Sequence, residues 1–348
     1  MTFVHDDPEF ADLLRIVAAS RGLAVSLIEK DYWVTHALWA LHAEGFEVWF
    51  KGGTSLSKGF GLIRRFSEDL DLKVAPGSTS IPVAQNWRSE GVKATAARRG
   101  FFEALASTLR VPGARVGLDP DADDPTWRNA RLQVRYPQAE PTARAGWMRP
   151  FVLLEVGDAR VTPFVLRDLG SLVHDELERL GRLDAYTENR PRGVCCVHPL
   201  VTLIEKLDAL QRRASIEANE PAAFVRHFED AARIIEAEAS LPALADHADV
   251  RALAEDMLAK RQIRALPRST DPAFALPQGP RTDQSGKRRT RSRRCSGVRG
   301  CRSTPRAWRS APGSRHGSSR RRSVQLRPFQ LLRHKERNKD VGPISRIR

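Results

Sequence analysis

The chain has 348 residues, enough for two domains with substantial cores, and a formal net charge of +15. Residues 281–348 hold 22 Lys and Arg against 3 Asp and Glu, a net of +19, so residues 1–280 carry a net of −4. This distribution excludes a globally basic nucleic-acid-binding domain, and any basic groove on the remainder must be local. The four cysteines, two of them adjacent, exclude a disulfide framework.

The first residues, MTFVHDDPEF, lack the basic region and the apolar core of a secretory signal. No segment approaches the roughly 20 consecutive apolar residues that a membrane-spanning helix needs. We therefore expect a cytoplasmic protein with no membrane partner.

Apolar residues recur at helical spacing over residues 8–20 and 22–43, which predicts two helices separated by a glycine. Near the start of the second helix lie Glu29, Lys30 and Asp31. We interpret these three charged residues as a solvated first turn.

Residues 46–50 alternate apolar and other side chains, as a short strand does. Gly52 and Gly53 then end the strand, and a glycine pair lets a ligand approach backbone N–H groups closely. Thr54 or Ser55 can cap the helix that follows. We interpret these four residues as a phosphate-binding turn.

A second predicted strand covers residues 69–74, where alternation places Asp69 and Asp71 on one face and apolar residues on the other. Two such carboxylates, roughly 7 Å apart along the strand, suit hard divalent cations. An Asp-x-Asp pair alone is more often a solvated face. The phosphate-binding turn shortly upstream favours the metal interpretation.

A helix is predicted over residues 89–110, with Lys93, Arg98 and Arg99 on one face. This basic face is either an ordinary solvated surface or an RNA-facing side. We favour the solvated surface.

Strands are predicted over residues 130–136 and 150–156, so a mixed α+β sheet is expected. Glu155 ends the second of these strands. It is either a third carboxylate beside Asp69 and Asp71 or a partly exposed residue at a strand end, and both interpretations remain open.

The chain then becomes helical, with Pro199 at a favourable first-turn position of one helix and a second helix predicted from Pro221 onward. Lys206 lies on the first helix and Asp230 on the second. Such residues are usually ordinary surface charges.

Residues 281–348 are rich in Arg, Ser, Gly and Pro and have no amphipathic period. The segment is either a disordered basic arm that adds salt-dependent affinity for nucleic acid or a non-native stretch, such as a shifted reading frame. We favour the second. The expected division is 1–195, an α+β core, 196–265, a helical region, and 266–348, a basic tail.

The stretch GGTSLSKGFGLIRRFSEDLDL, preceded by EKDYWVTHALWAL, resembles the nucleotidyltransferase AbiEii/AbiGii toxin family. This family belongs to the polymerase-β-like nucleotidyltransferase superfamily, whose signature is a strand ending in Gly-Gly/Ser, a helix and a strand with Asp-x-Asp. The resemblance extends over roughly residues 20–240. It implies that the helix at 22–43 packs behind the nucleotide site, so Glu29 and Lys30 are expected to be structural. It implies an α+β fold with a polymerase-β-like core, a mixed sheet flanked by helices, followed by a helical C-terminal region.

The resemblance implies a metal-dependent nucleotidyltransferase. Asp69, Asp71 and Glu155 would hold Mg²⁺ or Mn²⁺, which stabilises the attacking and leaving oxygens. Ser67 matches a family position that contributes to activity, and we expect it to orient a carboxylate.

The resemblance also implies residues that would bind the substrate, a nucleoside triphosphate (NTP). Lys206 would neutralise triphosphate charge, and Asp230 would position Lys206 or hold the acceptor. Lys58 and Arg65 are further candidates for phosphate contact, beside the turn that begins at Gly52.

Family members are toxins of toxin–antitoxin and abortive-infection systems, and some add nucleotides to the 3′ end of tRNA. The resemblance therefore implies a tRNA acceptor and a cognate antitoxin encoded alongside. Three alternatives stay open: a protein acceptor, a nucleotide-binding or nucleic-acid-binding protein without catalysis, and an inactive remnant.

Overall fold

The structure is a computed structural model that describes residues 1–65, 69–121, 124–139, 148–214, 221–268, 271 and 274. Met1–Ala273 form one compact unit and Phe274–Arg348 a second. The features described below all belong to the first unit.

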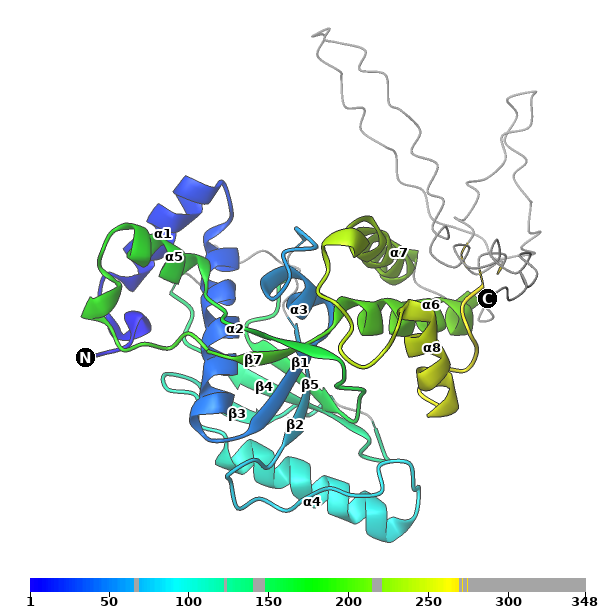
Figure 1. Cartoon of the computed structure of the whole chain (residues 1–348). Helices are drawn as coiled ribbons and strands as arrows, with labels where there is room; N and C mark the ends of the chain where they lie inside the picture. The colour runs from blue at the N-terminus through cyan, green and yellow to red at the C-terminus, as the bar shows by residue number, and fades with distance from the viewer. Residues whose placement is uncertain are drawn as a thin grey trace, which may run out of the picture. The chain divides into compact units, whose positions relative to one another are not determined.

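Seven strands of the described residues form one mixed sheet with the order β3-β4-β5-β2-β1-β7-β6 (Figure 1). The strands are β1 (Glu47–Lys51), β2 (Asp69–Ala75), β3 (Arg115–Leu118), β4 (Asn129–Arg135), β5 (Val152–Gly157), β6 (Phe164–Arg167) and β7 (Val194–Val197). Strand β2 pairs antiparallel with β1 and parallel with β5, and β1 pairs parallel with β7. The expected mixed α+β sheet is confirmed.

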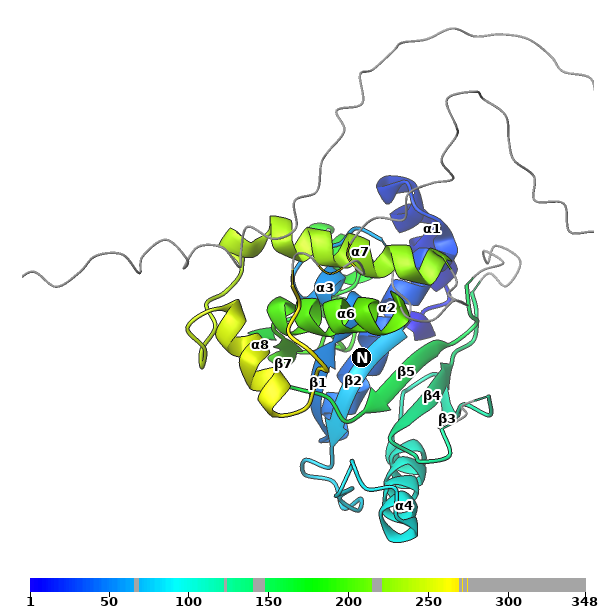
Figure 2. The same cartoon turned by 90° about the vertical axis from the view of Figure 1, so that its right-hand side faces the viewer.

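The helices flank this sheet. They are α1 (Phe10–Arg21), α2 (Val25–Ala43), α3 (Gly52–Lys58), α4 (Val92–Thr108), α5 (Leu172–Arg179), α6 (Pro199–Ala214), α7 (Pro221–Glu236) and α8 (Val250–Ala259). Helices α6, α7 and α8 lie close together in both views of the fold (Figures 1 and 2). No helix in the described part of the chain is long and apolar enough to cross a membrane.

The core lies between the sheet and helices α2 and α4. Along β2, Leu70, Leu72 and Val74 are buried in this core, whereas Asp69 and Asp71 face the other side. This alternation is the predicted one, and it follows from the two-residue period of a strand. The acidic residues are therefore placed on the side of the sheet away from α2 and α4.

The side chains of Glu29, Lys30 and Asp31 are all buried in α2, so the solvated first turn is wrong. Burial agrees with the structural role expected of Glu29 and Lys30. Glu29 accepts a hydrogen bond of 2.7 Å from the backbone N–H of Ala139. The ammonium group of Lys30 donates to the backbone carbonyl of Arg149 at 2.8 Å. Helix α2 thus holds both ends of the connection between β4 and β5.

The basic face expected on the helix at 89–110 is also wrong in part. The side chain of Arg98 on α4 is fully buried, and its guanidinium donates to the backbone carbonyls of Thr126 and Asn86. A guanidinium can be buried in this way because several carbonyls satisfy its N–H groups. Arg98 therefore joins two loops and is not part of an RNA-facing surface.

Helix α8, which lies within the helical region expected at 196–265, is joined to the sheet through Arg160 in the segment after β5. The Arg160 side chain is 4% exposed and lies 2.6 Å from the carboxylate of Asp256 on α8. It also donates to the side-chain oxygen of Gln262 at 3.0 Å. A buried charge of this kind needs its partner to offset the cost of leaving water.

We expect Asp256→Ala to lower the free energy of unfolding by about 2 kcal/mol, because it leaves the buried Arg160 guanidinium without its carboxylate. Urea denaturation measures this change. The matched control is Glu255→Ala on the same helix, which removes an exposed pair with Arg251 and should change the stability by less than about 0.5 kcal/mol. Equal effects of the two substitutions would show that the pair of Asp256 with Arg160 stabilises the fold no more than an exposed pair does.

Candidate active site

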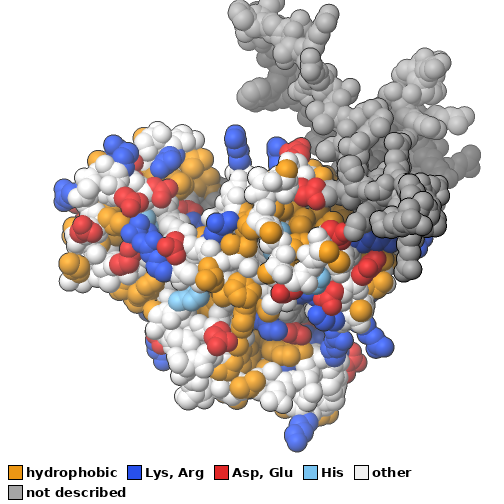
Figure 3. Space-filling view, in the orientation of Figure 1, with side chains coloured by type: hydrophobic (Ala, Val, Ile, Leu, Met, Phe, Trp, Pro, Cys, Tyr) orange, Lys and Arg blue, Asp and Glu red, His pale blue; other side chains and the backbone are white. Residues whose placement is uncertain are grey.

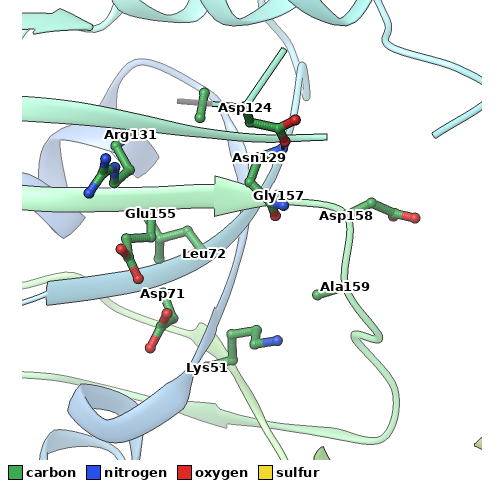
Figure 4. Close-up of a pocket in the computed structure, with 11 residues that line it drawn as sticks. Lys51, Asp71, Leu72, Asp124, Asn129, Arg131, Glu155, Gly157, Asp158 and Ala159 are labelled. Atoms are coloured by element: carbon green, nitrogen blue, oxygen red, sulfur yellow. Dashed lines mark hydrogen bonds between the residues drawn. The ribbon is translucent and has the colours of Figure 1, made fainter. Parts of the chain in front are cut away.

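Four charged side chains form a row across the face of the sheet opposite α2. The strand register pairs Lys51 of β1 with Asp71 of β2, Asp71 with Glu155 of β5, and Glu155 with Arg131 of β4. Directly paired residues project from the same face of a sheet. Figure 4 shows the carboxylates of Asp71 and Glu155 on the same side of adjacent strands. We call these four residues the charge row.

Asp71 and Glu155 are two carboxylates without a protein cation of their own. Neither forms an ion pair within the described residues. Burial raises the pKa of Asp71 to about 7, and the negative charges of Glu155 and Asp69 add to this effect against the opposing charges of Lys51 and Lys206. Burial is therefore the main cause of the raised pKa of Asp71, because the two lysine charges together outweigh the two carboxylate charges.

Gly52 permits the close approach of α3 to Asp71. Its φ angle is +73°, and a Cβ at this position would overlap the Asp71 carboxylate. A side chain here would be strained by the backbone angle and would also collide with the acid. The first glycine of the predicted phosphate-binding turn thus lies directly against the β2 carboxylate.

Asp69 has a different environment from Asp71. Its carboxylate lies 2.6 Å from the guanidinium of Arg149. Across the described ranges, no three or more His, Cys, Asp or Glu side chains come together closely enough to hold a metal ion. The predicted ligands Asp69, Asp71 and Glu155 are neighbours on two strands but are not assembled around one point.

The residues nevertheless fit a divalent cation in their chemistry. Carboxylate oxygens are the donors that Mg²⁺ and Mn²⁺ prefer. Burial disfavours the ionised form of Asp71, and a bound cation would favour it. Arg149 supplies the positive charge at Asp69, so binding of a divalent cation to the Asp69 carboxylate would require this ion pair to open.

The turn after β1 differs from its predicted form in one respect. Helix α3 begins at Gly52 with Lys51 as its N-cap, so the expected capping role of Thr54 or Ser55 is wrong. Both hydroxyl-bearing side chains are buried, and the Thr54 hydroxyl donates to the backbone carbonyl of Asp69 at 2.5 Å. This bond ties α3 to the start of the acidic strand.

Lys58, a predicted phosphate contact, lies at the other end of α3. Its ammonium group donates to the Asp31 carboxylate at 2.5 Å and to the backbone carbonyl of Gly170 at 3.0 Å. Asp31 also accepts from the backbone N–H of Leu172. The Lys58 side chain thus joins α2, α3 and the segment before α5.

Lys206 and Asp230, predicted on successive helices, form an ion pair of 2.7 Å between α6 and α7. The Asp230 side chain is fully buried and also accepts two hydrogen bonds from Arg65, at 2.6 and 3.1 Å. Burial alone would raise its pKa, but the Arg65 bonds and the Lys206 charge hold the pKa below its usual value. One carboxylate therefore positions two cations.

The structure brings most of the predicted site residues together. It also places three charged residues there that the sequence did not predict. The charge of Lys206 acts on Asp71, which places the α6 cation within electrostatic range of the acidic strands. Ser67 lies outside the described residues. Sequence reasoning missed Lys51, Arg131 and Arg149. Only Lys51 had a local signal, because it directly precedes the glycine pair.

A cavity of about 550 Å³ opens beside the two unpaired carboxylates. Its lining residues are Lys51, Asp71, Leu72, Asp124, Asn129, Ala130, Arg131, Glu155, Gly157, Asp158 and Ala159 (Figure 4). The cavity therefore contains the whole charge row and extends along the ends of β4 and β5. Its volume is within the range of small-molecule sites.

No single extended basic surface is seen among the described residues on the face of the molecule shown in Figure 3. Lys and Arg side chains alternate there with Asp and Glu over the part of the chain that the structure describes. This mixture agrees with the net charge of −4 on residues 1–280.

We expect Asp71→Asn to become more stable relative to the wild type as the pH rises from 5 to 8 in EDTA. With a pKa raised to about 7, folded Asp71 keeps a proton that the unfolded chain has released. The resulting stabilisation is complete below the unfolded pKa near 4 and is lost as the pH rises through about 7. Urea denaturation at both pH values should show a relative change on the order of 2 kcal/mol.

The control for this experiment is Asp12→Asn on α1, where the acid is 67% exposed. Its stability relative to the wild type should change much less with pH. A flat difference for Asp71→Asn over the same range would show that Asp71 ionises normally.

Comparison with known proteins places these features in a family. The family model described as nucleotidyl transferase AbiEii toxin, type IV TA system, matches residues 36–293. No curated protein matches significantly. A solved structure of the antibiotic-resistance factor ANT(2″)-Ia aligns over 67% of this chain and 94% of that chain, with 14% identity and a TM-score of 0.32. Since the family model covers most of the chain, the protein belongs to the AbiEii family of nucleotidyltransferase toxins from type IV toxin–antitoxin systems.

Proposed function

We propose that this nucleotidyltransferase transfers a nucleotide from an NTP to the 3′ end of tRNA, with Mg²⁺ or Mn²⁺ as cofactor. The observation that carries the metal-dependent chemistry is the facing pair Asp71 and Glu155, two carboxylates without an ion-pair partner in the described residues. A site that collects negative charge around a cavity suits a substrate that arrives with cations.

In this proposal Asp69, Asp71 and Glu155 hold the cations. When bound, divalent cations stabilise the attacking and leaving oxygens of a phosphoryl transfer. Asp71 and Glu155 require no rearrangement of a protein ion pair, whereas Asp69 exchanges its contact with Arg149. Ser67 keeps the role that the family resemblance implies, which is to orient a carboxylate.

The triphosphate is held on the α3 side of the carboxylates. Gly52 and Gly53 supply backbone N–H groups at the start of α3, where the first amides of a helix lack intrahelical partners. Thr54 and Ser55 would contact the triphosphate through their backbone N–H groups, because both side chains are buried. Lys58 stays a predicted contact, although its ammonium group binds Asp31 in this structure.

Lys206 neutralises charge on the phosphates, and Asp230 positions it. Because Asp230 also binds Arg65, the two cations share one carboxylate, so the group of three carries a net positive charge. This excess charge suits an anionic triphosphate. Arg65 is a second candidate for phosphate contact from the same group.

The proposed acceptor and partner follow from the family. Family resemblance supports tRNA as the acceptor and a cognate antitoxin as the partner, acting in the cytoplasm. The polar lining of the cavity supports a hydrophilic acceptor. The basic residues at 281–348, if native, would add affinity for RNA that falls with increasing salt.

Incubation with total tRNA, Mg²⁺ and each α-labelled NTP in turn tests the proposed reaction. We expect label in RNA from the wild type and a loss of at least about 100-fold in Asp71→Asn, because a carboxylate that supports cation binding is removed. Asp12→Asn, an exposed acid on α1, should keep full activity. Label that enters protein instead of RNA would overturn the tRNA acceptor, and folded wild type that transfers no label would overturn the reaction.

Lys206→Gln should raise the KM for the NTP by about tenfold, because it removes one positive charge near the phosphates. Steady-state rates at varied NTP concentration measure this effect. Lys260→Gln, which changes an exposed lysine paired with Asp256 on α8, is the charge-matched control and should leave the KM unchanged. An unchanged KM in Lys206→Gln would show that Lys206 does not contact the triphosphate.

A further inference from the structure

The lining of the cavity shares no residue with the proposed triphosphate contacts on α3 and α6. Its lining comes from β1, β2, β4, β5 and the loops that adjoin β4 and β5. Within the described chain, the lining includes none of the residues from Gly52 to Lys58, nor Lys206. The site thus has a second compartment that the proposed triphosphate contacts do not occupy.

The in-line geometry of phosphoryl transfer relates the two compartments. In phosphoryl transfer the attacking and leaving oxygens lie roughly in line, on opposite sides of the reacting phosphorus. In the charge row, Lys51 adjoins α3 at one end and Arg131 lies at the other end. If pyrophosphate leaves on the α3 side, the attacking hydroxyl must approach from the side of Glu155 and Arg131.

We propose that this cavity is the acceptor subsite, that it takes the terminal nucleoside of a single-stranded RNA, and that Arg131 binds the phosphate preceding that nucleoside. The inference rests on the proposed function and assigns a place to its acceptor. The terminal hydroxyl oxygen bonds to the α-phosphorus as the bond to the bridging oxygen of pyrophosphate breaks. Pyrophosphate leaves, and the hydroxyl proton is released to water.

Arg131 has the chemistry and the support for a phosphate contact. Its side chain is 37% exposed, its Nε lies 3.4 Å from the Asp119 carboxylate, and it donates to the backbone carbonyl of Asp121 at 2.7 Å. A guanidinium held in this way loses little rotamer freedom on binding and can contact a phosphate with two parallel N–H groups.

The remainder of the cavity favours a nucleoside over a peptide side chain. Most of its lining residues are polar or charged, whereas protein anchors are usually buried in apolar pockets. Four carboxylates in the lining, those of Asp71, Asp124, Glu155 and Asp158, repel phosphate, so a phosphate is favoured only beside a cation of the lining. Of the two cations, Arg131 is the one at the end of the charge row away from α3. At the end of β5, Gly157 lies against the Asn129 side chain, and a Cβ at Gly157 would displace this amide.

Crosslinking locates the acceptor without catalysis. The probe is a single-stranded RNA of about ten nucleotides with 4-thiouridine at its 3′ end, irradiated with the full chain in EDTA and mapped by mass spectrometry. We expect adducts within residues 124–135 or 155–160. Adducts confined to α3, α6 or the basic residues at 281–348 would overturn the assignment.

Kinetics with Arg131→Gln test the contact itself. We expect the KM for the RNA to rise by about tenfold while the KM for the NTP stays unchanged, because one phosphate contact is lost on the acceptor side. Arg135→Gln is the matched control: it lies on the same strand, stacks on Phe151 and does not line the cavity. Equal effects of the two substitutions, or an effect confined to the KM for the NTP, would overturn the role of Arg131.

These experiments distinguish a failure of the proposed acceptor subsite from a failure of the proposed reaction. If the wild type labels RNA and Arg131→Gln leaves the KM for RNA unchanged, the phosphate contact assigned to Arg131 is wrong and the reaction stands. If the wild type labels a protein and no RNA, both the RNA acceptor and this subsite are wrong. Thermal melts of each variant establish that the comparison concerns folded protein.

Discussion

The architecture of the site depends on one electrostatic constraint, the placement of Asp71 opposite Glu155 on adjacent strands. The lysines and arginines around them pair with other carboxylates: Lys51 with Glu205, Arg131 with Asp119, Arg149 with Asp69, and Lys206 with Asp230. Within the described residues, the facing pair is therefore left without an ion-pair partner of its own. A folded protein tolerates such an arrangement where a ligand or cation completes it.

The surrounding scaffold keeps these strands in register. Helix α2 contributes three buried charged residues, of which Glu29 and Lys30 hold the connection between β4 and β5, and Asp31 holds Lys58 of α3. Each buried charge is stabilised by hydrogen bonds to backbone groups or by an opposite charge. The helix behind the sheet thereby positions the strand that carries Glu155 and the helix that contacts Asp71.

The helical region is joined to the sheet by two buried electrostatic contacts. Asp230 of α7 binds Lys206 and Arg65, and Arg160 of the segment after β5 binds Asp256 of α8. The cations near the proposed triphosphate therefore come from both the helical region and the loop before β2. Met1–Ala273 form one compact unit, so the helical region predicted at 196–265 packs in the same unit as the sheet.

Local sequence patterns determined the parts of this protein that depend on short-range periodicity. Alternation predicted β1, β2, β4 and β5, helical spacing predicted α1, α2, α4, α6 and α7, and the glycine pair with Asp69 and Asp71 predicted the α3 turn and the acidic strand. The strands β3, β6 and β7 and the short helix α5 were not assigned, because strands of four residues and a helix of eight are too short for a clear pattern in the sequence. Helix α8 lies within the helical region expected at 196–265. The tertiary structure alone decided which charges are buried and with what partners. Arg98 looks like a surface residue in the sequence, and Glu155 faces Asp71 only through strand register, because such pairings join residues far apart in the chain and leave no local pattern.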